Sequence, residues 1–155
     1  MDVSRRTLLG VRQPRRRAVG ATVGLLAGCT FAFLVRLDTA IPLGRWELGF
    51  AVFAAGFVVA AYAGWTHGGT LPGVSSVFLL SLWMAFFPPA VAYLQGREYA
   101  GDRYSTVRLT QALYSPSKEL GVVIEQVPLL LVGALLFGGA AFLVGTGARR
   151  LAGRR

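Results

Sequence analysis

Residues 74–95 read VSSVFLLSLWMAFFPPAVAYLQ, and no residue in this stretch carries a formal charge. The hydrocarbon core of a bilayer is about 30 Å thick, so a helix needs about 20 mostly apolar residues to span it. Three more uncharged stretches of similar length lie at residues 18–35, 48–65 and 127–148. Backbone amides in lipid must be hydrogen-bonded within their own segment, which favours helices. The sequence therefore predicts an all-α integral membrane bundle of four transmembrane helices.

The composition supports this class of protein. The chain has 155 residues, of which 54% are hydrophobic and 15% are charged, whereas soluble domains are about 25% charged. The length fits one domain, so we expect a single membrane domain over residues 1–155. Its expected parts are a basic N-terminus (1–17), four spans (18–35, 48–65, 74–95 and 122–148), an outer loop (96–121) and a basic tail (149–155).

The basic residues predict the orientation of the bundle. The two terminal segments hold ten of the 16 Lys and Arg residues, with Asp2 as their one acid, while the opposite side has equal numbers of basic and acidic residues. The positive-inside rule then places both termini in the cytoplasm of a multi-pass cell-membrane protein. The charge of +9 predicts contact with anionic lipid headgroups rather than with nucleic acid.

Two motifs resemble export signals. Residues 4–10, SRRTLLG, resemble a twin-arginine signal, and residues 26–29, LAGC, resemble a lipoprotein cleavage site. The apolar run continues past Cys29 as TFAFLV, and a second arginine cluster (PRRR, 14–17) separates the first motif from it. We therefore expect an uncleaved first span in a prokaryotic protein. The alternative is a precursor that is cleaved and carries lipid on Cys29.

Stripes of small residues predict close helix packing. The first span has Gly20, Gly24 and Gly28, and the second has Gly56, Ala60 and Gly64, in both cases four residues apart. Small residues let membrane helices approach closely. Such stripes pack either within the bundle or against another chain, and both hold if one stripe faces inward and the other outward.

Three residues mark candidate functional positions in or near the spans. Pro88 and Pro89 each remove an amide donor in the third span, which predicts a kink. Glu125 is an acid at the outer margin of the last span. It is either a functional carboxylate or a side chain that snorkels to the interface or contacts an outer arginine such as Arg36 or Arg97.

The outer loop and the last helix have their own signals. Residues 105–114 are expected to form a short interfacial helix. Ser115 and Pro116 resemble a helix N-cap and first helical residue, and we expect a bend at Pro128.

No catalytic, cofactor or metal site is predicted. The chain has one histidine (His67), one cysteine and one lysine, too few for a structural zinc site or for a nucleophile with a positioned base. The expected role is a non-catalytic accessory or scaffold subunit with a homo-oligomeric or membrane-protein partner. The alternative is a small oligomeric transporter or channel.

Overall fold

A computed structural model describes residues 8–35, 45–96 and 115–153 of the chain. These residues form helices, with a short turn at residues 67–69, and no strand occurs within them. The elements are α2 (Arg12–Leu34), α4 (Arg45–Thr66), α5 (Thr70–Leu94), α6 (Pro116–Gly133), the π-helical turn η2 (Ala134–Gly138) and α7 (Gly139–Ala152). The expected all-α fold is confirmed.

Three helices are long and apolar enough to cross a membrane, namely Arg12–Leu34, Thr70–Leu94 and the combined helix Ser117–Ala152. The fourth expected span lies in α4, whose 22 residues extend for about 33 Å. Its described apolar part, Phe50–Thr66, is shorter than the other three. The four-span count therefore stays a prediction.

The helices begin earlier than expected. The first begins at Arg12 instead of residue 18, the second at Arg45 instead of 48, and the third at Thr70 instead of 74. Arginine is a good helix former, and Pro14 and Pro72 fall in first turns, where proline's missing amide costs no hydrogen bond. The connection that we expected to run over residues 66–73 therefore shortens to a tight turn at residues 67–69.

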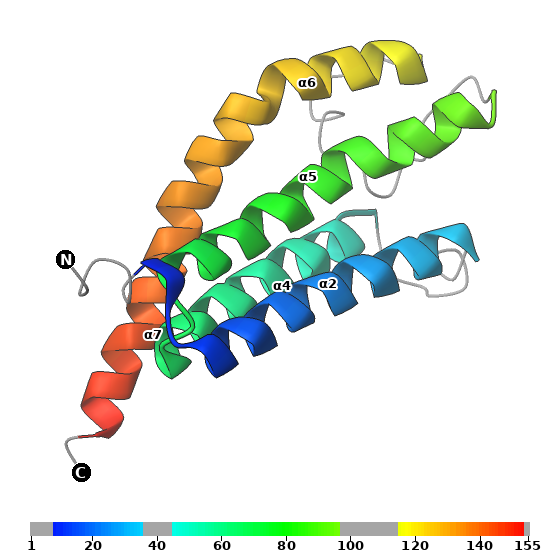
Figure 1. The fold of residues 1–155 in the computed structure, drawn as a ribbon. Coiled ribbons are helices and arrows are strands. Elements are labelled where there is room, and N and C mark those ends of the chain that lie inside the picture. Colours follow the sequence, from blue (N-terminus) through cyan, green and yellow to red (C-terminus); the bar gives the residue numbers. More distant parts are fainter. Residues whose placement is uncertain (1–7, 36–44, 97–114, 154–155) are drawn as a thin grey trace.

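The last helix differs most from the expected span at 122–148. It begins at Pro116 after the N-cap residue Ser115, as the sequence predicted, and it runs to Ala152. The helical stretch Ser117–Ala152 has 36 residues, about 54 Å if straight, which exceeds a bilayer core. The ribbon bends within α6, the element that contains Pro128. The part of α6 after the bend continues into α7 (Figure 1).

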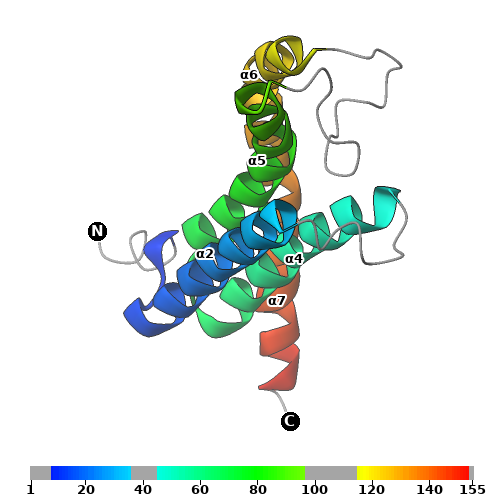
Figure 2. The same cartoon turned by 90° about the vertical axis from the view of Figure 1, so that its right-hand side faces the viewer.

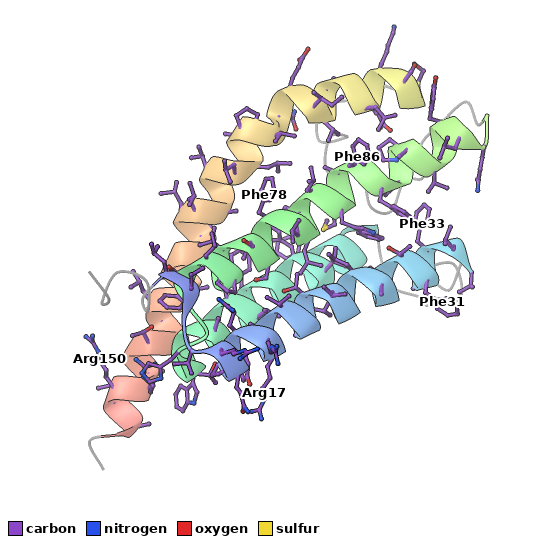
Figure 3. The ribbon with its side chains drawn as sticks, in the orientation of Figure 1. Arg17, Phe31, Phe33, Phe78, Phe86 and Arg150 are labelled. Atoms are coloured by element: carbon purple, nitrogen blue, oxygen red, sulfur yellow. The ribbon has the colours of Figure 1, made fainter. Side chains whose placement is uncertain are left out.

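Helices α2, α4 and α5 lie side by side, α7 packs against α4, and α6 packs against α5 (Figures 1 and 2). We call the end of the bundle that carries Arg12–Arg17 and Arg149 the arginine end. The opposite end is the far end. A central core unites α2, α4 and α5 around four buried side chains, Val52, Leu80, Trp83 and Met84. Figure 3 shows Phe33 of α2 directed toward α5, where it meets Phe87 edge-on with ring centroids 5.5 Å apart.

Candidate functional site

The turn between α4 and α5 at the arginine end is closed by a Schellman motif. The Gly68 amide donates to the Ala63 carbonyl over 2.7 Å, and His67 adopts a left-handed conformation with φ of 62°. This pattern satisfies carbonyls that a helix C-terminus leaves unpaired. His67 is exposed. Its left-handed backbone conformation is the one that a Schellman motif requires at this position.

Arg149 of α7 completes the same helix end. Its Nη1 donates to the Gly64 carbonyl over 3.0 Å and to the Trp65 carbonyl over 3.3 Å. A cation at a helix C-terminus is favoured because the macrodipole is negative there. Within the basic tail expected to meet lipid, Arg149 therefore holds α7 to α4, while Arg150 is exposed and points away from the bundle (Figure 3).

The last residues of the SRRTLLG motif pack against this turn. The Val11 amide donates to the His67 carbonyl over 2.8 Å. Gly10 and Gly69 both have positive φ, and a Cβ on either would overlap the facing backbone of the other segment. Residues 8–11 are therefore packed against the α4–α5 turn by contacts that need glycine on both sides.

The glycine stripe of α4 packs inside the bundle. A Cβ on Gly56 would lie 3.2 Å from the Val77 Cα of α5, and a Cβ on Gly64 would overlap the Phe142 carbonyl of α7. Ala60, between them, is fully buried. Helix α7 also has a glycine at this contact, because a Cβ on Gly145 would overlap the Ala61 carbonyl of α4.

The glycine stripe of α2 faces away from the bundle. Gly20, Gly24 and Gly28 are exposed, and apart from the adjoining residues and backbone of α2 itself no described atom lies within 4 Å of a Cβ added at any of them. Gly20 and Gly24 each follow a buried residue, Ala18 or Thr22, by two positions, a rotation of about 200° on a helix. The stripe therefore lies opposite the buried face of α2 and makes no contact with the described residues.

Cys29 lies on the packed side of the same helix. It is half-buried and contacts the core formed by Val52, Leu80, Trp83 and Met84. The next residue, Thr30, accepts a hydrogen bond of 2.9 Å from Trp83 Nε1 of α5. Residues before and after the LAGC motif thus pack into one bundle.

Pro88 and Pro89 do not interrupt α5, which continues through them to Leu94. Both side chains are almost fully buried, so they belong to the interior. The kink expected at these prolines stays a prediction. A π-helical turn occurs at η2, where the sequence predicted no irregularity. There Ala134 is buried against Ala60 and Val77, and a Cβ on Gly138 would lie 3.2 Å from the Val74 Cα.

Glu125 is exposed, and its proposed partners Arg36 and Arg97 lie outside the described residues, as does the expected interfacial helix at 105–114. The buried acid is Glu119, which is 0% exposed. It stands one turn before the buried Val123, which packs against Ala85 of α5. The helix start at Ser115–Pro116 puts Glu119 in the first turn of α6, where a carboxylate is favoured. The burial of Glu119 depends on how α6 packs against α5, which the sequence does not reveal.

No group of three or more potential metal ligands occurs within the described ranges. No protein-family model, curated protein or solved structure matches the chain. The structure thus defines a helical protein with apolar helices of membrane-spanning length.

Proposed function

We propose that the chain is a non-catalytic subunit of the cell membrane that acts by lateral association of α2 with another membrane helix. The observation that carries the proposal is the outward face of α2. Its glycine stripe, Gly20, Gly24 and Gly28, lies open, and Phe31, which is 62% exposed, projects away from the bundle at its end (Figure 3). Small residues bring helix backbones close together, where van der Waals contacts stabilise association in lipid.

The distribution of burial supports this assignment. Only 11% of the apolar window is buried in α2 and also in the last helix, Ser117–Ala152, against 44% for α5, so α2 is distinguished by its open stripe and not by low burial alone. The stripe of α4, which has the same spacing, is covered by α5 and α7. The chain thus carries one small-residue stripe that packs internally and one that is available to a second helix. Four spans with both basic termini in the cytoplasm complete the proposal.

The proposal includes an uncleaved first span. Ala18 and Thr22, before the LAGC motif, are buried, and Thr30, after it, bonds to Trp83. Removal of residues 1–28 would delete the buried Ala18 and Thr22 from the bundle. It would also remove the hydrogen bond between the Val11 amide and the His67 carbonyl. Intact mass spectrometry of the protein from its native membrane tests this point. We expect a mass near 16.6 kDa, and a lipidated fragment beginning at Cys29 would contradict the proposal.

The association itself is tested by native mass spectrometry of the detergent-solubilised protein with Gly24→Ile and a matched control, Gly147→Ile. Both glycines are helical, exposed and open to an added Cβ, but Gly147 lies on α7. We expect the wild-type chain and Gly147→Ile to form the same complex and Gly24→Ile to lose it. A chain that is monomeric in its native membrane extract, or equal loss in both variants, would refute the role of this face.

Transport by an oligomer is the second candidate, and the buried carboxylate of Glu119 favours it, because ionisable groups inside membrane proteins commonly mark ion paths. Reconstituted liposomes separate the two functions. Solute or proton flux that disappears in Glu119→Gln, while the fold persists, would establish transport. Absence of flux in liposomes containing the intact complex would leave the accessory role.

A further inference from the structure

A groove of about 250 Å³ lies between the first turns of α2 and α5, at the arginine end of the bundle. Its walls are formed by α2 and α5, and Leu9 of the N-terminal segment also lines it. The lining residues are Leu9, Arg15, Val19, Thr22, Val23, Leu71, Pro72, Ser75, Ser76 and Leu79. From Leu71 to Leu79 the groove extends for about 12 Å along the helix. It is on the side of α2 that faces α5, away from the glycine stripe.

The wall of the groove is apolar despite its hydroxyl groups. Thr22 Oγ1 donates to the Ala18 carbonyl over 3.0 Å. Ser76 Oγ lies 2.7 Å from the Gly73 carbonyl and 3.1 Å from the Gly56 carbonyl. Two of the three lining hydroxyl groups are thus engaged, Ser75 carries the third, and the remaining lining residues apart from Arg15 are apolar, so the groove suits a hydrocarbon chain.

The rim of the groove is open to the surroundings. Val19, Val23 and Leu71 are 48%, 59% and 54% exposed, and all three belong to helices of membrane-spanning length and hydropathy. A hydrocarbon chain can therefore enter sideways from the bilayer without crossing a polar barrier.

A single arginine marks the arginine end of the groove. Of the four arginines in the first two turns of α2, Arg15 is half-buried and lines the groove, whereas Arg12, Arg16 and Arg17 are exposed. Among the described side chains no carboxylate lies near it, since Glu119 and Glu125 belong to α6, which packs against α5 rather than α2. A guanidinium presents a planar set of donors that matches phosphate oxygens.

An apolar slot that opens to lipid and ends at an arginine matches one class of amphipathic molecule. We propose that the groove binds an anionic phospholipid, with one acyl chain between α2 and α5 and the phosphate on Arg15. Lipid binding in the groove rests on the membrane location in the proposed function. It does not require the association of α2 with a partner, so the lipid site and the helix association can each fail without the other.

The test is native mass spectrometry of the full chain released from nanodiscs that contain equal amounts of phosphatidylglycerol and phosphatidylcholine. Arg15→Gln removes the charge at the groove, and Ser75→Leu fills its half-buried wall. Arg16→Gln is the matched control, because it removes the same charge from the next residue, which is exposed and outside the groove. Circular dichroism establishes that each variant keeps its helices.

We expect one retained phosphatidylglycerol per chain, retention reduced about fivefold or more in Arg15→Gln, loss in Ser75→Leu and no change in Arg16→Gln. Equal losses in Arg15→Gln and Arg16→Gln would overturn the proposal in favour of diffuse attraction by the basic cluster. Equal retention of the two lipids would overturn it as well. Displacement of the lipid by glycerol phosphate would show that the phosphate alone binds, which also contradicts a site for the acyl chain.

Discussion

Replacement of Gly145 by alanine should weaken the bundle more than the same change at Gly139 or Gly147, the other glycines of α7. The added Cβ would overlap the Ala61 carbonyl of α4. That neighbour is backbone, so α4 and α7 must move apart to accept it. The movement also strains the hydrogen bonds from Arg149 Nη1 to the Gly64 and Trp65 carbonyls. Overpacking of a well-packed site costs about 1–3 kcal/mol.

Gly147→Ala supplies the reference, because Gly147 lies on the same helix and has open space around an added Cβ. There alanine should be neutral or stabilise the helix by up to about 1 kcal/mol, the difference in helix propensity. The gain in helix propensity applies at both positions, so the two variants should differ by about 1–3 kcal/mol in the free energy of unfolding. A gap of this size is about fivefold or more in the folding equilibrium.

The assay is reversible unfolding in mixed micelles with increasing sodium dodecyl sulfate, followed by helical circular dichroism and tryptophan fluorescence. We expect Gly145→Ala to unfold at a clearly lower detergent fraction than Gly147→Ala. Gly64→Ala, whose Cβ would overlap the Phe142 carbonyl from the opposite helix, should resemble Gly145→Ala. If Gly145→Ala equals or exceeds the stability of Gly147→Ala, the close α4–α7 contact is refuted.

Three further outcomes are expected in the same unfolding assay. Arg149→Met removes the donors at the end of α4 and should cost about 1–2 kcal/mol, while the exposed Arg150→Met should cost little; equal effects would contradict the cap. His67→Gly should be neutral or stabilising by up to about 1 kcal/mol because it relieves a positive φ, whereas His67→Val should destabilise; a stable valine variant would argue against this turn. Thr30→Val removes the acceptor of the Trp83 indole and should cost about 1 kcal/mol, with a coupling to Trp83→Phe in a double-mutant cycle; additive effects would show that the bond contributes nothing.

Local signals in the sequence predicted the helices well. Uncharged runs of sufficient length located the helices, and Ser115 with Pro116 located the start of the last one. The starts of the other helices were placed too late because charge defined the edges of the runs, whereas a helix continues into any good helix-forming residue. Arg12 begins α2 for this reason. The π-helical turn at η2 has no local signal, since it forms where Ala134 and Gly138 both meet α5.

The candidate sites were harder to predict. Glu125 drew attention because it adjoins an apolar run, yet it is exposed, while Glu119 is buried. Position along the chain does not reveal which side of α6 faces α5. The same holds for Arg15, which differs from its basic neighbours only by its side of α2.

The sequence by itself determined the all-helical fold class, the apolar runs that form the helices and the spacing of small residues, because hydropathy and helical periodicity are properties of neighbouring residues. Two stripes of identical spacing were indistinguishable at that level. Only the tertiary structure decided that Gly56, Ala60 and Gly64 are covered by α5 and α7 and that Gly20, Gly24 and Gly28 are open. The physical reason is that the rotation of each helix about its axis is set by contacts between segments far apart in the chain.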